Sequence, residues 1–259
     1  MCTACNQTDR QKTEVGTTQN QKEEQQNNQL SENAIPDISY ADYSQKLTEE
    51  ETGKLLLKVE ENCPVVTLAG NEETAGMINR VFEQQHVRNE MRIKSNLSTA
   101  QSDFYSLEEE ETEQWKGYKY EYIYENMYAS SKILSMKASQ KEELGIEQDY
   151  EDVVAYTFYV PEGKLLTLSD IFSDVKSAQA IVEQYIQKTV TGEKYAAYLL
   201  EDYESYISDI LTEDVFYLDE QGLVVICNGD MLTEPEAGVI EIRVPYKALK
   251  DVMNEQYLP

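Results

Sequence analysis

The 259-residue sequence contains one histidine, few basic residues and no long apolar run. A lone His86 cannot build a histidine-based transition-metal site, and a serine triad would have to use it although no Gly-x-Ser-x-Gly motif is present. We therefore interpret His86 as a partly buried structural residue. No run of about eighteen apolar residues occurs, so no segment is expected to span a membrane.

Positive charge is scarce: 22 basic residues face 49 acidic ones, for a net charge of −27. The stretch up to Pro36 holds three basic and five acidic residues, so the remainder carries −25. Such a field repels nucleic acid and favours encounter with cationic partners. Among so many acids, a carboxylate pair suited to glycoside hydrolysis cannot be recognised without geometry. No metal or cofactor is expected.

Two of the four cysteines lie in the start Cys2-Thr3-Ala4-Cys5, which resembles the end of a bacterial lipoprotein signal, with Cys5 as the lipidated residue. The alternatives are a CxxC redox or zinc pair, or cysteines without a role. A zinc site needs further soft ligands nearby, and a redox pair needs a helix N-terminus that lowers a thiol pKa. Neither is present, so lipidation is the favoured interpretation.

Residues 6–36 are rich in Gln, Asn, Glu and Thr and lack aromatic residues and periodicity. Such a segment buries too little apolar surface to fold. We expect residues 1–36 to be a lipoprotein N-terminus and disordered linker. As a flexible coil of about thirty residues, the linker would span ~30 Å.

Cys63 and Cys227 lie in apolar, strand-like surroundings. Cysteines there are either inert packing residues or, outside the cell, partners in one disulfide, and the sequence spacing does not decide between the two.

Folded structure is expected from about Tyr40. Residues 54–66 are typical of a strand with a bend at Pro64, and Asn71 is a good N-cap for a helix whose apolar face includes Ala75, Ile78 and Phe82. Residues 116–160 alternate with period two and predict three strands.

The second half of the chain predicts further helices and strands. The expected elements are a helix from Asp174 to about Gly192, an amphipathic run over 199–210, a hairpin turning at 219–222, a strand over 239–244 and a short helix over 245–257. The class is α+β, with antiparallel sheets and a few packed helices in two small subdomains, 40–160 and 161–259.

Several local strings carry a family resemblance. They are Cys63-Pro64-Val65-Val66, Ile78-Asn79, Gly163-Lys164-Leu165-Leu166-Thr167-Leu168-Ser169-Asp170-Ile171-Phe172, Phe216-Tyr217-Leu218, Gly222-Leu223-Val224, Ala237-Gly238 and Ile242-Arg243-Val244-Pro245-Tyr246. In this order they resemble the paired extracytoplasmic domains DUF4163 (40–160) and DUF3298 (161–259). These domains occur in RsiV-type anti-sigma factors and beside the catalytic domain of PdaC-type peptidoglycan deacetylases.

Tyrosine is unusually common, with 19 copies against one Trp and five Phe. Tyr118, Tyr120, Tyr122 and Tyr124 fall on one face of a predicted strand. They are either the buried face of a sheet or, less favoured, an exposed ligand-binding platform for a protein, peptide or glycan.

The Cys5 start and the family resemblance together lead us to expect a non-catalytic lipoprotein binding module, anchored at the outer face of the cell membrane of a Gram-positive bacterium. It would sense or bind a cationic secreted protein such as lysozyme, or peptidoglycan fragments. The alternative is an accessory or degenerate cell-wall hydrolase or deacetylase domain that uses paired carboxylates.

Overall fold

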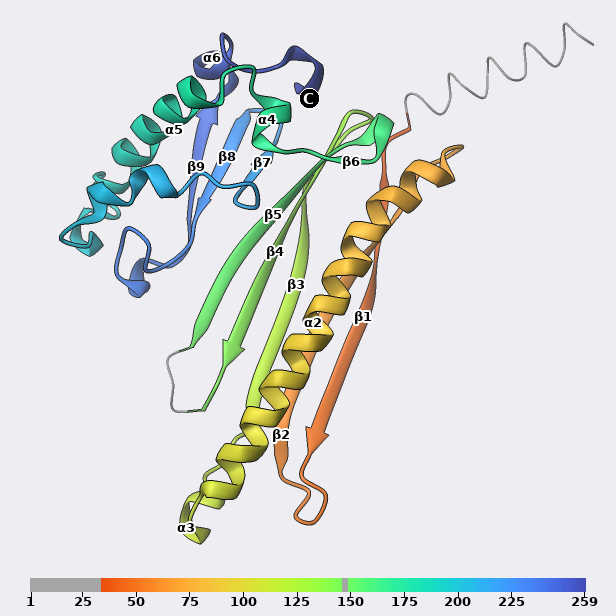
Figure 1. The fold of residues 1–259 in the computed structure, drawn as a ribbon, viewed down its shortest axis with the longest axis vertical. Coiled ribbons are helices and arrows are strands. Elements are labelled where there is room, and N and C mark those ends of the chain that lie inside the picture. The colour runs from red at the N-terminus through yellow and green to blue at the C-terminus, as the bar shows by residue number, and fades with distance from the viewer. Residues whose placement is uncertain (1–33, 146–148) are drawn as a thin grey trace, which may run out of the picture.

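The structure, a computed structural model, describes residues 34–145 and 149–259. Six strands form one sheet in the order β1-β2-β3-β4-β5-β6. They are β1 (Asp37–Thr48), β2 (Leu55–Thr67), β3 (Tyr118–Ala129), β4 (Ile133–Glu143), β5 (Tyr150–Tyr159) and β6 (Lys164–Leu165). Neighbours are antiparallel except β2 and β3, which are parallel because the long helix α2 (Glu72–Ser106) connects them. The short helix α3 (Glu109–Thr112) follows α2 (Figure 1).

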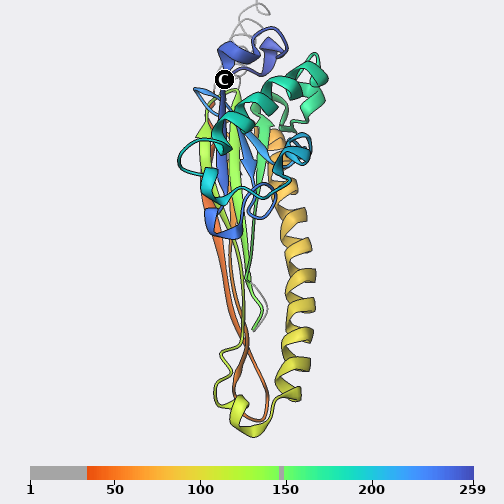
Figure 2. The same ribbon diagram turned by 90° about the vertical axis from the view of Figure 1, so that its left-hand side faces the viewer.

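Helix α2 lies along one face of this sheet (Figure 2). Asn71 caps it as expected, since its side chain accepts a hydrogen bond from the Thr74 amide at 3.2 Å. The helix runs for 35 residues, far beyond the predicted apolar face that ends near Phe82. Its later buried positions include Asn89 and Asn96, which is why hydrophobic periodicity did not reveal its length.

The C-terminal half forms a second sheet in the order β7-β8-β9, namely β7 (Phe216–Leu218), β8 (Gly222–Cys227) and β9 (Ile240–Pro245). Helices α4 (Leu168–Ile171), α5 (Val175–Val190) and α6 (Tyr246–Leu249) accompany it. The predicted hairpin, the strand near 239–244 and the helix from Asp174 are confirmed. The run over 199–210 is instead a series of short 3-10 turns, and the terminal helix is reduced to α6 and a 3-10 turn at Glu255–Tyr257.

Alternation along β4 and β5 divides the molecule into two hydrophobic cores. Tyr156 and Phe158 pack under α2, whereas Val153 and Ala155 pack against the C-terminal elements. The C-terminal unit, which comprises β7–β9 and helices α4–α6, therefore covers the sheet face opposite to α2. The architecture confirms an α+β fold.

Asparagine side chains take the place of a strand partner at three points. Asn62 bonds both backbone groups of Tyr124, Asn79 of α2 does so for Val66, and Asn228 does so for Val153, at 2.6–3.1 Å. Each primary amide offers one donor and one acceptor, as a strand neighbour does. Buried backbone groups beyond the ends of the ladders are thus satisfied.

Candidate functional site

Two buried carboxylates lie under α2. Glu61 of β2 and Glu142 of β4 occupy inward positions on strands that flank β3, and their residues are 3% and 0% exposed. A buried ionised group is stable only if it is paired and hydrogen-bonded. Both acids meet this condition through side chains of the helix.

Glu142 accepts hydrogen bonds on both oxygens. Arg92 donates from Nε to Oε1 at 2.8 Å and from Nη2 to Oε2 at 2.9 Å, which is the bidentate arrangement. Asn96 Nδ2 adds a bond to Oε2 at 3.0 Å, and Gln140 Nε2 adds one to Oε1 at 2.5 Å. The ion pair with Glu142 raises the pKa of Arg92.

Glu61 has a parallel arrangement about two turns earlier on α2. His86 Nδ1 lies 2.8 Å from Glu61 Oε2, and Asn89 Nδ2 donates to Oε1 at 2.8 Å. Tyr43 of β1 stacks on the His86 ring with centroids 4.5 Å apart. His86 is thus partly buried, as predicted, and its contact with the Glu61 carboxylate is an addition that the sequence did not suggest.

A cavity of about 300 Å³ opens beside these two acids. Its lining consists of two arginines, three amides and two tyrosines: Arg88, Arg92, Gln85, Asn89, Gln140, Tyr120 and Tyr150. None of these described lining residues is acidic. Most small-molecule sites are largely apolar with a few polar groups, whereas this open cavity is lined by polar side chains and suits a polar ligand.

Tyr120 lies between the two acids, opposite Glu142 in the β3–β4 ladder. It is fully buried, and its hydroxyl has no hydrogen-bond partner among the residues that the structure describes. Burial, followed by the negative charges of Glu61 and Glu142, raises its pKa well above the ordinary value. The hydroxyl therefore keeps its proton at neutral pH.

The tyrosine stripe is buried along its whole length. Tyr118, Tyr120, Tyr122 and Tyr124 are at most 3% exposed, and their rings pack under α2. The favoured interpretation, a buried sheet face, is confirmed. The alternative of an exposed ligand-binding platform is wrong for these four residues, because the helix covers them.

The disulfide hypothesis is also wrong. Cys63 and Cys227 are both free and buried. Cys63 lies in the core under α2, whereas Cys227 lies in the C-terminal core. Burial raises the pKa of Cys63 to about 11 and that of Cys227 to about 12, so neither is a reactive thiolate at neutral pH.

Other sequence predictions remain untested. Cys5 and the CxxC start lie outside the described residues. Within the described ranges, no group of three or more His, Cys, Asp or Glu side chains could hold a metal ion. None of the described helices has the length and apolar character needed to cross a bilayer.

A second concave region, of about 490 Å³, lies where the sheet meets the C-terminal unit. Its lysines are mostly matched by acids: Lys137 pairs with Glu125 at 3.3 Å and Glu241 at 2.8 Å, and Lys141 pairs with Glu151 at 3.0 Å. These pairs are partly exposed and contribute little stability. The region joins the two units and offers few uncommitted polar groups.

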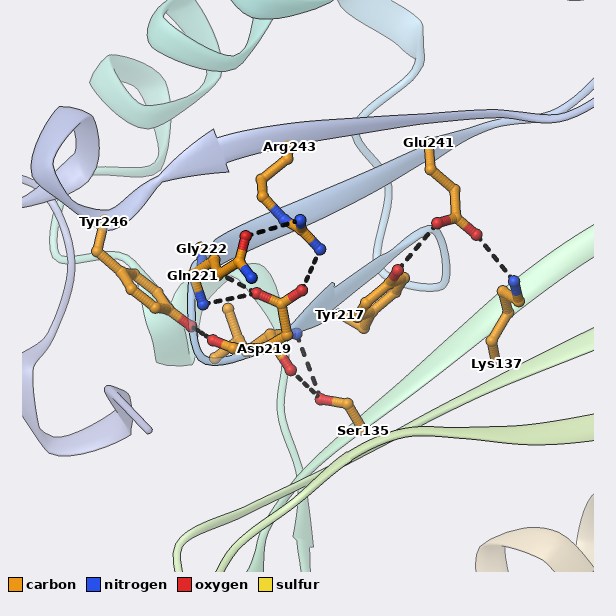
Figure 3. Close-up of polar contacts among 10 residues, drawn as sticks. Ser135, Lys137, Tyr217, Asp219, Gln221, Gly222, Glu241, Arg243 and Tyr246 are labelled. Carbon is orange, nitrogen blue, oxygen red and sulfur yellow. Dashed lines mark hydrogen bonds and ion pairs between the residues drawn. The ribbon is translucent and has the colours of Figure 1, made fainter.

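Figure 3 shows the polar contacts at this junction. Glu241 accepts from Tyr217 and Lys137, and Ser135 donates to the Leu218 carbonyl at 2.6 Å. Asp219 Oδ1 accepts the amides of Gln221 and Gly222 at 2.8 and 3.0 Å. The string at 219–222 is therefore a tight turn, as predicted, in which Asp219 Oδ1 accepts backbone amides and Asp219 Oδ2 pairs with Arg243.

Glu61 and Glu142 were not singled out from the sequence. A signal was present, because each interrupts the apolar inward face of its strand: Glu61 follows Val59, and Glu142 follows Met136 and Ala138 at period two. A carboxylate at an inward strand position requires a partner on the covering element.

Comparison with known proteins identifies the fold. A DUF3298 family protein from Bacteroides fragilis NCTC 9343 aligns with a TM-score of 0.66 and 15% identity, covering 85% of this chain and 94% of that one. A DUF3298 family protein from Pseudomonas aeruginosa PAO1 aligns with a TM-score of 0.57 and 9% identity, covering 86% and 96%. No family model and no curated protein matches the sequence. At these identities the likeness extends to the fold alone.

Proposed function

We propose that this chain is a non-catalytic binding module of the bacterial cell envelope and that it takes a cell-wall glycan fragment in the cavity under α2. The observation that supports this most is the cavity itself, which is lined by arginines, amides and tyrosines. It lies beside Glu61 and Glu142, whose carboxylates are paired with side chains of α2. Planar amide and guanidinium groups hydrogen-bond to hydroxyls and acetamido groups of a sugar.

Binding without catalysis fits the state of the two acids. A glycosidase needs one carboxyl group that reaches the leaving oxygen as a proton donor and a second that reaches the anomeric carbon or a water. Glu142 is completely buried and accepts from Arg92, Asn96 and Gln140. Its oxygens are occupied in holding the fold, which argues against the hydrolase alternative.

The test is sedimentation of the full chain with insoluble peptidoglycan at physiological salt, with analysis of released saccharides by mass spectrometry. We expect the protein to sediment with the polymer and to release no fragments. Failure to sediment would reject the glycan role, and so would sedimentation that soluble muropeptides do not reduce. Release of saccharides would instead establish the hydrolase.

A second candidate ligand is a cationic secreted protein such as lysozyme, which the net charge of −27 favours. Because Tyr118, Tyr120, Tyr122 and Tyr124 are buried, they do not form an exposed aromatic platform for such a complex. Calorimetry against lysozyme at low and physiological salt separates specific binding from general attraction, which fades as the screening length falls to ~8 Å.

The extracytoplasmic location and the lipid on Cys5 belong to the same proposal. Expressed with an upstream signal region, the protein should partition into detergent, and Cys5→Ala should release it into the aqueous phase. Equal partitioning of both proteins would remove the lipid anchor and leave the binding role in place.

A further inference from the structure

The cavity under α2 differs in charge from the rest of the molecule. The chain has 49 acidic and 22 basic residues, yet the only charged side chains among the described lining residues are Arg88 and Arg92. An anionic group would therefore find a cation, Arg88, at the cavity wall of a strongly negative protein, on the side away from the buried charges of Glu61 and Glu142 that act on Tyr120. The concave shape increases this effect, because low-dielectric walls focus the local field.

The two arginines are not equivalent. Arg92 is neutralised by the bidentate pair with Glu142. Arg88 donates from Nε and Nη2 to a single neutral oxygen, Gln85 Oε1, at 2.9 and 2.6 Å. None of the ion pairs found in residues 34–145 and 149–259 includes Arg88. Its guanidinium is positioned by Gln85, and donors remain for a carboxylate or phosphate.

Tyr120 supplies a second, independent indication of a ligand. A buried hydroxyl without a partner is costly, and native structures rarely leave one without a reason. Tyr120 is 0% exposed, lines the cavity and has no such partner among the described residues. An acceptor atom on a bound ligand would satisfy it.

From these observations we infer that the cavity recognises an anionic sugar, whose acidic group pairs with Arg88 and whose ring substituents bond to Tyr120 and the surrounding amides. This rests on the proposed glycan-binding function and names the ligand class. A volume of about 300 Å³ is at the lower end of small-molecule sites, which suits a single substituted sugar ring. The acidic group could be a carboxylate or a phosphate, because a guanidinium binds both.

Calorimetry of the full chain with three sugars tests the inference. N-acetylmuramic acid carries a lactyl carboxylate that N-acetylglucosamine lacks, and N-acetylglucosamine 1-phosphate carries a phosphate instead. We expect the acid or the phosphate, or both, to bind at least about tenfold more tightly than the neutral sugar, since a charge-assisted bond is lost without the anion. The two anionic sugars separate the carboxylate from the phosphate. Equal affinity for all three, or binding of none, would overturn the inference.

Matched variants locate the contact. Arg88→Gln should weaken binding of the preferred anionic sugar about tenfold. Arg80→Gln removes the same charge from the same helix outside the cavity lining and should leave affinity within about twofold. If both variants weaken binding equally, the sugar responds only to the net charge of the protein, and the proposed contact with Arg88 is wrong.

Tyr120→Phe removes a buried hydroxyl without a partner that belongs to a cavity-lining residue, and Tyr124→Phe removes a second such hydroxyl of β3 outside the cavity lining. Only Tyr120→Phe should weaken sugar binding, and both proteins should keep the wild-type far-ultraviolet circular dichroism spectrum. Equal affinity of Tyr120→Phe and the wild type would overturn the role of this hydroxyl.

The sedimentation and calorimetry results together distinguish recognition of the anion by Arg88 from binding to peptidoglycan. If wild type and Arg88→Gln sediment equally with peptidoglycan, glycan binding holds and recognition of the anion by Arg88 fails. If the protein binds the anionic sugar and does not sediment with the polymer, the cavity inference holds and the peptidoglycan role fails.

Discussion

The sheet face under α2 carries tyrosines and two carboxylates and meets buried asparagines of the helix, whereas the opposite face carries Ile133, Val153 and Ala155 and meets an apolar core. Both faces belong to the same strands, and alternation assigns each residue to one of them. The apolar face depends mainly on complementary shape, with Ser135 and Thr157 bonded to strand carbonyls of β7, while the polar face has ionised groups that each need a partner. Among the described residues of the polar face, the buried hydroxyls of Tyr120 and Tyr124 have no hydrogen-bond partner, and only Tyr120 lines the cavity.

The largest effects are expected from truncation of either core. Phe82 is fully buried under α2 and contacts the rings of Tyr124, Tyr156 and Phe158. Phe82→Ala should reduce the free energy of unfolding by ~3–5 kcal/mol, because it leaves a cavity in a packed core. Urea unfolding followed by circular dichroism measures this loss, and a change below 1 kcal/mol would contradict the packing described.

A truncation on the opposite face shows whether the two cores unfold together. Ile226→Ala, in the C-terminal core, should cost ~2–5 kcal/mol. Trp115, the single tryptophan, packs against Phe104 and Tyr118 on the helix side. Since β4 and β5 belong to both cores, the urea midpoint from Trp115 fluorescence should fall by as much as the midpoint from circular dichroism. A fluorescence midpoint that stays at the wild-type value would show two independent units.

Substitution of the buried Glu142 should reduce the free energy of unfolding more than substitution of its exposed neighbour Glu143. Glu142 receives only donors, so Glu142→Gln would turn an amide N–H₂ toward Arg92, Asn96 or Gln140. We expect a loss of ~1–3 kcal/mol in urea unfolding. Glu143→Gln is the control, because its side chain is 57% exposed and pairs only with Lys119, and it should change stability by less than about 0.5 kcal/mol. Equal effects would remove the distinction between the two faces.

A smaller loss is expected where an asparagine extends the β2–β3 ladder. Parallel pairing ends at Asn62 and Ile123, and the Asn62 side chain bonds the next backbone groups, those of Tyr124. Asn62→Ala should cost ~1–2 kcal/mol, because it leaves a strand N–H and C=O without partners. Asn126→Ala, at an exposed position of β3, should be neutral in the same urea titration. A neutral Asn62→Ala would mean that water replaces the amide.

Much of the fold follows from local patterns in the sequence. Period-two alternation predicts β3, β4 and β5, and the turn string at 219–222 predicts the C-terminal hairpin. β1 was missed because it is an edge strand with nearly all positions exposed, so its sequence has no apolar alternation. The length of α2 was missed because its second half packs through Asn89 and Asn96 against polar partners.

The candidate site was harder to predict than the fold. Glu61 and Glu142 are two of 49 acidic residues, and only the three-dimensional pairing with His86, Asn89 and Arg92 distinguishes them. The tyrosine stripe was recognised, but its burial depends on a helix whose extent the periodicity did not show. The pairing of the two acids and the burial of the tyrosines both depend on packing against a helix that is distant in the sequence. Local sequence patterns do not encode such packing.

The smallest effect concerns the far end of the helix-covered face, where the turn between β1 and β2 is held by Glu49. Its carboxylate accepts from the Thr52 amide at 2.6 Å, the Thr52 hydroxyl at 2.7 Å, the Glu51 amide at 3.0 Å and the Tyr105 hydroxyl of α2 at 3.2 Å. These bonds, led by the Thr52 amide, lower the pKa of Glu49 to about 2 from its ordinary value of 4.5. A lowered carboxylate pKa stabilises the fold above the unfolded-state pKa, and this contribution is lost as pH falls from about 4.5 toward 2.

Glu49→Gln should therefore lower the urea midpoint at pH 6, and the gap to the wild type should narrow at pH 3. The reason is that protonation of Glu49 in the unfolded wild type cancels part of its advantage. Glu50→Gln, a neighbour with an exposed side chain, removes the same charge and controls for the net charge of −27. Its gap to the wild type should be small at both pH values. A Glu49→Gln gap that is constant from pH 6 to pH 3 would show that the charge of Glu49 does not stabilise the turn. Of the substituted acids, Glu142 would then be the one whose charge stabilises the helix-covered side.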